Sequence, residues 1–246
     1  FQNTVMSKRK LTWFVENGYV AGWDDARFPT IRGVLRRGLH VEALRQFMYA
    51  QGASRRVVNM EWNKFWAENK KQVDKQAKRF MAISADAHVV LNITNGPASG
   101  ENAFVTTDCH PKDPSLGRRV VRTANQVLLE SIDVEGLKVG DEIVLIRWGL
   151  VKITKIGQDN DGAFEGVLDE NGNIKTAKKL SWIVKDHNLE CTLTQFDNLI
   201  LKDKLEEEDD FQNFINPNTM ATQKVFADAG LKTLQRHEVI QLKTLQ

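Results

Sequence analysis

A short basic segment near the start of the chain has the residue types of an anion-binding site. Met6–Arg9 (MSKR) precedes a run in which Leu11, Phe14 and Val15 follow helical spacing. A Ser hydroxyl, a Lys ammonium and the unpaired N–H groups of a helix N-terminus all favour an anion, and phosphate is the obvious candidate. Taken alone, a Ser-Lys pair at a helix start is more often an ordinary cap with a solvated cation. The segment is therefore a candidate site that needs support from its surroundings.

Two other groups of residues have chemical potential but weaker patterns. Asp24 and Asp25 form a carboxylate pair that could serve acid–base chemistry or Mg²⁺, yet their place in a loop between helices favours capping. Cys109 and His110 are two metal-ligand types without partners, so no metal site is predicted. Two cysteines, the second being Cys191, cannot build a disulfide framework and fit a reducing compartment.

The charge of the chain is unevenly distributed. Its 246 residues carry a net charge of +2, but residues 1–82 hold 16 Lys and Arg against 7 Asp and Glu, a net of +9. Residues 83–246 hold 18 against 25, a net of −7. Such asymmetry suggests contact with a polyanion at the basic end and says nothing about the fold.

The composition excludes several classes of protein. A hydrophobic content of 41% with six Trp rules out a disordered chain. No run approaches eighteen apolar residues, so no transmembrane helix is expected. The chain begins with Phe and has no basic-then-apolar leader. We therefore expect no secretory signal and a start that is internal to a longer protein.

The elements that must position the basic segment are helices. Apolar residues recur at helical spacing through residues 1–82, and the helices end at glycines that suit a left-handed cap. The predicted helices run from Ser7 to Gly18, from Pro29 to Gly38, from Val41 to Gly52, and onward from a cap at Asn59.

From residue 83 onward the period of the pattern changes toward two. Short β-rich runs alternate with turns at Gly149, 160–162 and 171–173, and Glu206–Asp210 is interpreted as a solvated acidic loop. The fold class predicted is α+β, with a helical region at 1–82 and two small antiparallel β-barrels at 83–246, consecutive or interleaved. The predicted strands are His88–Ile93, Val127–Ser131, Glu142–Trp148, Val151–Ile156, Leu180–Lys185, Leu189–Gln195 and Glu238–Leu242.

Three segments in close succession carry a family resemblance. They are Val5–Leu11 (VMSKRKL), Gly22–Thr30 (GWDDARFPT) and Arg32–Gly38 (RGVLRRG). This succession resembles the class I glutamyl- and glutaminyl-tRNA synthetases of the archaeal and eukaryotic cytosolic type. In that family a variant KMSKS loop is followed by a GWDDPR loop and a GLRRRG-like helix. Ala26 departs from the family's usual Pro, which loosens the loop but should not remove chemistry.

The resemblance implies a role for the basic segment. In the family this loop clamps the ATP triphosphate while the amino acid carboxylate attacks the α-phosphate to give an aminoacyl adenylate. The implied ATP-binding residues are Met6, Ser7, Lys8 and Arg9, with Lys8 as the catalytic residue that stabilises charge on pyrophosphate. Mg²⁺ would accompany ATP in the parent enzyme. The family's upstream Rossmann domain with its HIGH motif has no counterpart here, so we expect a C-terminal portion that is catalytically incomplete by itself.

Two further segments favour the glutamyl branch of the family. Val57–Trp66 (VVNMEWNKFW), continued by Asn69–Lys71, resembles that branch's VVNMEWDKIWAFNKK, and His110–Pro114 (HPKDP) resembles its HPKNP turn. The resemblance thus implies a cytoplasmic protein whose full-length form binds glutamate, ATP and tRNA(Glu). A multi-synthetase complex is among its candidate partners. A glutaminyl enzyme, and a non-catalytic tRNA-binding or scaffold module, stay open as alternatives.

Arginines of the helical region are candidates for contact with the tRNA stem. Single arginines on helices are usually solvated, but the net charge of +9 favours phosphate contacts for the group. The predicted stem contacts are Arg32, Arg36 and Arg37, with Arg55 and Arg56 nearby.

Candidates for anticodon recognition come from three places. Arg79 lies in a segment (KRFMAI) that resembles the family's APRYVAL junction, and a guanidinium can hydrogen-bond or stack on an unpaired base. Lys178 and Lys179 open a segment (KKLSW) similar to TTKVTW, and Gln241 lies in one (VIQL) similar to IIQLERRGYF. Lys243 and Thr244 then stand where the family has Glu and Arg, which puts the closing strand and an arginine contact in doubt.

Overall fold

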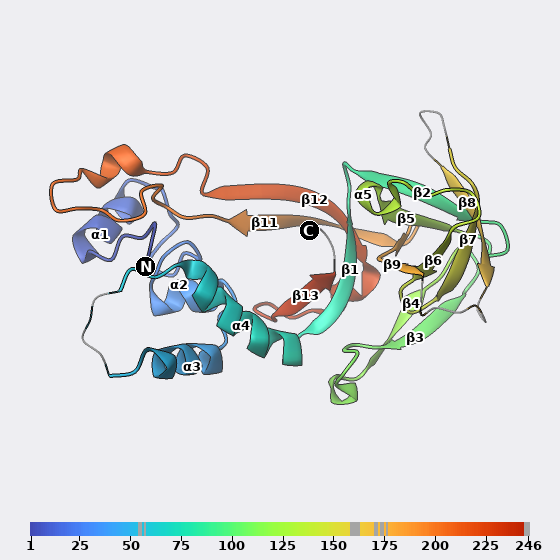
Figure 1. Ribbon diagram of the computed structural model, residues 1–246, viewed down its shortest axis with the longest axis horizontal. Coiled ribbons are helices and arrows are strands. Elements are labelled where there is room, and N and C mark those ends of the chain that lie inside the picture. The colour runs from blue at the N-terminus through green and yellow to red at the C-terminus, as the bar shows by residue number, and fades with distance from the viewer. Residues whose placement is uncertain are drawn as a thin grey trace. The chain divides into compact units, whose positions relative to one another are not determined.

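The computed structural model describes residues 1–53, 56, 58–157, 163–169, 172, 175 and 177–243 (Figure 1). The chain forms two compact units. The first unit comprises Phe1–Gln76 and Thr194–Thr222, and the second comprises Ala77–Leu193 and Gln223–Gln246. The sequence prediction places one boundary after residue 82. The contacts place it after Gln76 and return a later segment of about thirty residues to the first unit.

The first unit is helical. Its helices are α1 (Lys8–Glu16), α2 (Ile31–Arg36), α3 (Val41–Gln51) and α4 (Trp62–Gln76), with a 3-10 turn η2 (Phe211–Phe214) in the returning segment.

The predictions for α1 and α3 are confirmed, because Gly18 and Gly52 follow these helices with φ of 72° and 66°. Two predicted starts are wrong. Pro29 precedes α2 rather than lying in its first turn, since the Thr30 hydroxyl caps the helix by accepting from the Gly33 N–H at 3.0 Å. Asn59 does not cap α4, which begins at Trp62.

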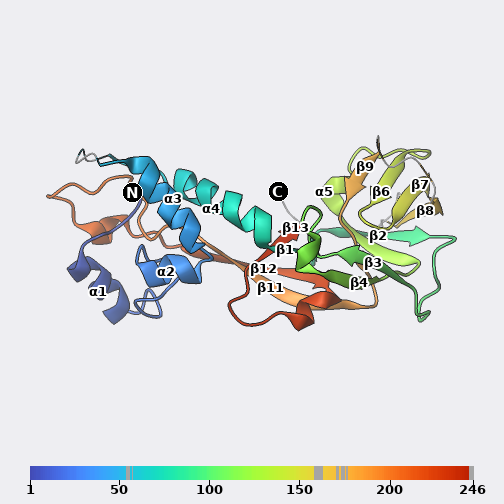
Figure 2. The same ribbon diagram turned by 90° about the horizontal axis from the view of Figure 1, so that it is seen from below.

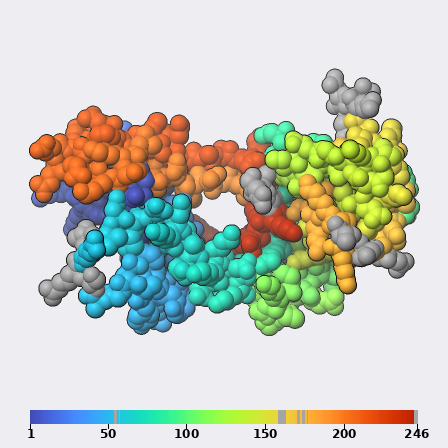
Figure 3. All heavy atoms as spheres, viewed as in Figure 1, coloured from blue at the N-terminus to red at the C-terminus, as the bar shows by residue number. Residues whose placement is uncertain are grey.

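The first unit has two apolar clusters. In one, Val34, Leu39, Ala43, Phe47 and Phe65 join α2, α3 and α4. In the other, side chains around α1 pack against the returning segment; its buried members are Val5, Leu11, Phe14, Val20, Phe28, Leu199 and Ile200. Figure 3 shows the orange surface of residues 197–219 lying over the blue surface of α1. Residues from opposite ends of the chain thus form one core.

The second unit contains a sheet that curls on itself (Figure 2). Within the described residues its strand order is β10-β5-β2-β8-β7-β6-β9. Only Ser181 and Trp182 separate β9 from β10, so the two edges of the sheet are adjacent in the chain. The buried Trp182 side chain fills the interior and its indole Nε1–H donates to the Ile146 carbonyl at 2.9 Å. The strands are β2 (His88–Ile93), β5 (Gln126–Glu130), β6 (Glu142–Leu145), β7 (Gly149–Lys155), β8 (Phe164–Asp169), β9 (Lys178–Leu180) and β10 (Ile183–Val184).

Two smaller sheets complete the strands. The four-stranded sheet has the order β11-β12-β1-β13, and β3 pairs with β4 alone among the described residues. Their bounds are β1 (Lys78–Ser84), β3 (Phe104–Asp108), β4 (Arg118–Arg122), β11 (Asn188–Phe196), β12 (Met220–Asp228) and β13 (Ile240–Lys243). Short helical turns are α5 (Ser131–Val134), η1 (Pro114–Leu116) and η3 (Ala229–Thr233).

The α+β class is confirmed, with differences in detail. Most described ladders are antiparallel, but β1–β13, β2–β8 and β6–β9 pair in parallel. The predicted turn at Gly149 is wrong, because Gly149 is the first residue of β7 and the turn is formed by residues 146–148. Strands β1, β3, β4, β8 and β12 were not predicted. The predicted turn 160–162 lies outside the described residues, as does most of 171–173.

Two simpler expectations are also answered. Cys109 and Cys191 are both free thiols. No helix within the described residues combines the length and the apolar character that a membrane crossing requires.

Candidate nucleic-acid interface

The basic segment lies exposed between two buried anchors. Val5 and Leu11 are 5% and 6% exposed, whereas Met6–Arg9 face solvent. Ser7 is the N-cap of α1, and its carbonyl accepts from the Leu11 N–H at 2.9 Å. Its side chain makes no capping hydrogen bond in the described structure, so the hydroxyl stays available to a ligand.

The electrostatics of this helix start are unfavourable for the chain alone. Lys8, Arg9 and Lys10 occupy the first turn, which holds no acidic residue. Each cation at the positive end of a helix costs roughly 0.3–1 kcal/mol, and a bound anion would reverse that sign. A surface hollow of about 210 Å³ adjoins the segment, and its lining includes Met6, Ser7, Lys10 and Lys204. The cations of this lining are Lys10 and Lys204, and the Asp203 carboxylate also lines it; with the Ser7 hydroxyl, the two cations suit a phosphate group.

The loop before α2 is built around Asp25. Its carboxylate accepts from the backbone N–H groups of Ala21 and Arg27, each at 3.0 Å, and pairs with the Arg27 guanidinium at 2.9 Å. Burial alone would raise the pKa of Asp25, but the hydrogen bonds from Arg27 and Ala21 lower it from 3.8 to about 2. The predicted capping role is not seen for Asp25, because Thr30 caps α2 and the Asp25 carboxylate instead holds the loop together. The Asp24 side chain points to solvent and forms an exposed ion pair with Arg36 at 3.1 Å.

The same loop approaches α2 closely at Gly33. A Cβ there would lie 2.5 Å from the Phe28 carbonyl oxygen and 2.6 Å from that of Asp25. Both neighbours are backbone atoms, which move little. Glycine is therefore required at this position for the loop to pack on the helix, whatever its cost in helix propensity.

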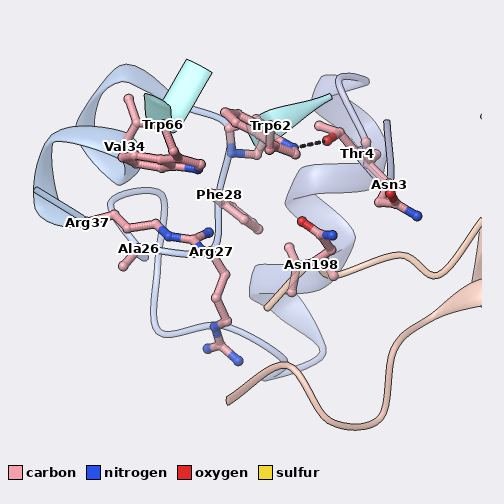
Figure 4. Close-up of a pocket in the computed structure, with 13 residues that line it drawn as sticks. Asn3, Thr4, Ala26, Arg27, Phe28, Val34, Arg37, Trp62, Trp66 and Asn198 are labelled. Carbon is pink, nitrogen blue, oxygen red and sulfur yellow. Dashed lines mark hydrogen bonds between the residues drawn. The ribbon is translucent and has the colours of Figure 1, made fainter. Parts of the chain in front are cut away.

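The three predicted stem arginines lie in different surroundings. Arg32 is exposed and makes no hydrogen bond or ion pair to any described residue. The Arg36 side chain is 46% exposed beside Asp24. Arg37 extends beneath Trp66 in Figure 4, with its guanidinium 5.1 Å from the ring centroid, and it donates to the Phe196 carbonyl at 2.9 Å.

Burial lowers the pKa of Arg37, although the charge of Asp197 acts in the opposite direction. The guanidinium of Arg37 is thus already engaged within its own unit, whereas Arg32 and Arg36 are accessible. Arg55 lies outside the described residues.

Strands β1 and β13 place two of the predicted anticodon residues side by side. In this parallel ladder Arg79 pairs with Gln241, and Met81 pairs with Lys243. Residues in register share a face of the sheet, so Arg79, Gln241 and Lys243 lie on one face. The Gln241 Oε1 is buried and accepts no hydrogen bond from the described residues. This oxygen is therefore an acceptor suited to a ligand donor.

Further cations gather at this face. Burial lowers the pKa of Lys243, and the charges of Arg147, Lys179 and Arg79 lower it further. Burial also lowers the pKa of Arg147, together with the charges of Arg119 and Arg79. These charge effects indicate a shared neighbourhood, and β6, which leads into the turn at Arg147, pairs with the β9 strand of Lys179. We name Arg79, Arg147, Lys179 and Lys243 the cation group and leave out Arg119, whose charge is paired with Asp228. With Gln241 the group offers donors and an acceptor to an anionic ligand.

Lys178 and Lys179 differ in surroundings, as alternation along β9 requires. The Lys178 ammonium donates to the Asp133 carbonyl at 2.6 Å and lies 3.9 Å from its carboxylate. Lys179 instead joins the cation group. The structure thus brings Arg79, Lys179 and Gln241 together and leaves Lys178 paired at α5.

Sequence reasoning missed two members of the cation group. Arg147 is in the turn between β6 and β7 with φ of 69°, a left-handed conformation that costs a non-glycine residue about 1–2 kcal/mol. Such strain at a cationic side chain is typical of a binding site, but the sequence around it carried no matching signal. Lys243 was treated only as a departure from the family, although its positive charge was visible.

The Cys109–His110 pair has a structural explanation. His110 is 2% exposed, and its Nδ1 accepts from the Lys112 N–H at 3.2 Å. Asp113 caps the turn η1 through the Ser115 N–H at 3.0 Å. Nowhere in the described ranges do three His, Cys, Asp or Glu side chains gather as metal ligands.

Comparison with known proteins matches three consecutive parts of the chain to one family. Residues 1–75 match the catalytic domain of the class I (E and Q) tRNA synthetases. Residues 77–170 and 179–243 match two anticodon-binding domain models of the same family.

Individual relatives agree along the whole chain. The cytoplasmic glutamate–tRNA ligase of Arabidopsis thaliana is 41% identical over 98% of this chain and 34% of its own length. That of Saccharomyces cerevisiae is 38% identical over 99% of this chain and 34% of its own length. The bifunctional glutamate/proline–tRNA ligase of Mus musculus is 41% identical over 98% and 16% respectively.

The chain thus spans about a third or less of the length of these relatives. The three domain matches nevertheless follow one another from residue 1 to residue 243. With the basic loop at α1 and the cation group at β1 and β13, they show that the chain belongs to the class I glutamyl- and glutaminyl-tRNA synthetase family.

Proposed function

We propose that this chain is the C-terminal, tRNA-binding portion of a class I glutamate–tRNA ligase, which attaches glutamate to tRNA(Glu) through a glutamyl adenylate. In this proposal residues 1–82 supply the ATP-clamping loop and the stem contacts. Residues 83–246, together with Arg79 just before them, supply anticodon recognition. The observation that carries the proposal is the cation group with Gln241, in which Arg79, Gln241 and Lys243 share one face of β1 and β13.

The cation group suits unpaired nucleotides better than a duplex. Guanidinium groups such as Arg79 and Arg147 can stack on bases or donate to their edges, and lysines such as Lys179 and Lys243 neutralise phosphates. Gln241 adds an acceptor, which distinguishes bases by their donors. We assign base recognition to Arg79 and Gln241 within this surface. Lys178, held by Asp133, would act at its edge.

The loop at α1 would hold ATP in the parent enzyme. Its exposed side chains, the Ser7 hydroxyl and the start of α1 fit a triphosphate. Lys8 would face the charge that develops on pyrophosphate, and Met6, Ser7 and Arg9 would shape the loop around the nucleotide. Mg²⁺ would accompany ATP, neutralising phosphate charge. Since the adenylate chemistry also needs the amino-acid pocket, it is assigned to the parent enzyme.

The relatives' names favour glutamate over glutamine. Several cytoplasmic glutamate–tRNA ligases match at 33–41% identity, and bifunctional glutamate/proline–tRNA ligases match in the same range. We therefore place the protein in the cytoplasm and count other synthetases among its candidate partners. A glutaminyl enzyme is the competing assignment for the same surface.

A gel-shift titration tests the proposal. The 246-residue chain is titrated against labelled transcripts of tRNA(Glu), tRNA(Gln) and tRNA(Glu) with an exchanged anticodon, each at two salt concentrations. We expect tRNA(Glu) to bind most tightly and all affinities to fall steeply with salt, because phosphate contacts release counterions. Preference for tRNA(Gln) would move the protein to the glutaminyl branch. Equal affinity for all three transcripts would refute anticodon recognition.

A further inference from the structure

A buried ion pair joins the two-stranded sheet to the four-stranded sheet of the second unit. Arg119 of β4 pairs with Asp228 at the end of β12, and their side chains are 10% and 5% exposed. The Asp228 carboxylate also accepts from the Gly230 N–H at 2.8 Å. Charges so deeply buried persist only when well paired, so the two residues fix β4 against β12 and η3.

Arg119 also covers the residue next to Arg79. Its guanidinium lies 4.9 Å from the centroid of the buried Phe80 ring. Gly230 leaves room for this arrangement, because a Cβ there would lie 3.0 Å from an Asp228 carboxylate oxygen and 3.3 Å from the Phe80 ring. Arg119 is thus clamped between Asp228 and Phe80, and Phe80 directly follows Arg79 in β1.

The ion pair holds these strands together at a cost in free energy. Within the described residues, the Nε–H and the Nη2–H groups of Arg119 are buried and donate to no acceptor. Apolar side chains at both positions would avoid that cost, since replacing a whole buried ion pair by apolar residues is often neutral or stabilising. A guanidinium retained at a cost, beside the cation group, points to a role beyond packing.

We infer that Arg119 is a positioning residue for base recognition: held by Asp228, it presses on Phe80 and sets the position of β1 from which Arg79 meets the anticodon. The inference rests on the proposed function of the cation group. It adds a residue outside that group whose action passes through Phe80. Arg119 itself touches no RNA in this account.

The test compares Arg119→Met with a matched control, Arg118→Met. Arg118 is the preceding residue of β4, but its side chain is 65% exposed and only pairs with Asp108 at 3.4 Å. For each variant of the 246-residue chain, gel shifts give the Kd for tRNA(Glu) with its own and with an exchanged anticodon. The measured quantity is the discrimination ratio, which is the Kd for tRNA(Glu) with an exchanged anticodon divided by the Kd for tRNA(Glu) with its own anticodon. A change in the folded fraction alters both Kd values alike and cancels from this ratio.

We expect Arg119→Met to lower the discrimination ratio by roughly fivefold, whereas Arg118→Met leaves the ratio at the wild-type value. The salt dependence should not change in Arg119→Met, because no phosphate contact is lost. If this variant fails to fold, Arg119→Lys provides the same comparison: its ammonium can still pair with Asp228 but cannot lie flat on Phe80. A wild-type ratio in the folded Arg119 variant overturns the inference.

Arg79→Ala, measured in parallel, distinguishes a failure of the positioning role of Arg119 from a failure of the proposed function. If Arg79→Ala loses discrimination and the Arg119 variants do not, the positioning role is wrong and the proposed function stands. If Arg79→Ala keeps full discrimination, the proposed function of the cation group fails first.

Discussion

At the scale of single residues, Asp25 shows how one buried carboxylate organises a loop. It satisfies two backbone N–H groups and the Arg27 guanidinium, which in turn donates to the Thr219 hydroxyl at 2.8 Å. A carboxylate in this position is stabilised in its charged form, so its loss should be felt through pH.

We predict an acid-dependent loss of stability centred on this residue. Because the folded pKa is about 2 and the ordinary value is 3.8, the stabilisation is complete above about pH 4 and is lost as pH falls toward 2. The contribution is about 2 kcal/mol. In denaturant unfolding, the free energy of unfolding of wild type should exceed that of Asp25→Asn at pH 7, and this difference should become smaller below pH 4. Asp24→Asn, at the exposed neighbour, is the control and should change little; a difference independent of pH would contradict the assignment.

Arg79 and the stem arginines should differ in what they do for binding. Arg79→Ala should weaken binding to tRNA(Glu) by about 1–3 kcal/mol and spare the tRNA with an exchanged anticodon, because a base contact carries sequence information. A double Ala variant of Arg32 and Arg36 should weaken both tRNAs alike, since phosphates are the same in both. Kd values from the same titration check this. Equal losses in the Arg79 variant would remove it from base recognition.

At the scale of elements, the contact between the loop and α2 depends on a missing side chain. Gly33→Ala would normally stabilise a helix by up to about 1 kcal/mol. Here the added Cβ meets two carbonyl oxygens of the loop, so we expect a destabilisation of about 1–3 kcal/mol, seen as a lower melting temperature. Gly22→Ala is the matched control, because its Cβ would meet only an Asp24 carboxylate oxygen at 3.4 Å. A higher melting temperature for Gly33→Ala would show that the loop yields.

At the end of β13, Lys243 should trade stability for binding. Burial and neighbouring cations lower its pKa, so the folded chain binds this proton less well than the unfolded chain does. The charge therefore costs stability below the folded pKa, and the cost disappears as pH rises toward 10.5. Because Lys243 is exposed and water screens its charge, Lys243→Met should be only slightly more stable than wild type at pH 7. It should bind tRNA more weakly, with a salt slope smaller by about 1. Melting curves at two pH values and salt titrations check both halves; unchanged tRNA affinity would exclude Lys243 from the interface.

Elements that depend on local signals could be predicted from the sequence. The apolar stripes and terminal glycines of α1 and α3, and the alternation in β2, needed no distant partner. Strand β12 was missed because its first five residues are all exposed and show no alternation, so that its place between β11 and β1 is what makes it a strand. Likewise strands β3 and β4 were missed because nine residues separate them, and their connection carries no short-turn signal.

The candidate site divides in the same way. Arg79 and Gln241 could be predicted because they lie in segments similar to a known family. Arg147 could not, because its position depends on the turn between β6 and β7 and on strands far away in the sequence. For Arg37 the basic run predicts phosphate contact, but the contacts of its guanidinium with Trp66 and the Phe196 carbonyl depend on the fold and carry no local signal.

At the scale of the whole molecule, net charge alone misleads about where nucleic acid binds. The part with net charge −7 supplies Arg147, Lys179 and Lys243 of the cation group, because its acidic residues lie elsewhere, as in Glu206–Asp210. What decides binding is the local gathering of cations from several strands, and only folding brings these strands together.

The return of Thr194–Thr222 to the first unit has a consequence for the order in which the protein forms during synthesis. The strands of the curled sheet all lie between residues 88 and 184, so that sheet can close while later residues are still being added. The helices come first from the ribosome, yet Phe14 and Leu11 wait for Leu199 and Ile200 to cover them. Within this chain, α1 is therefore synthesised long before the residues that complete its core.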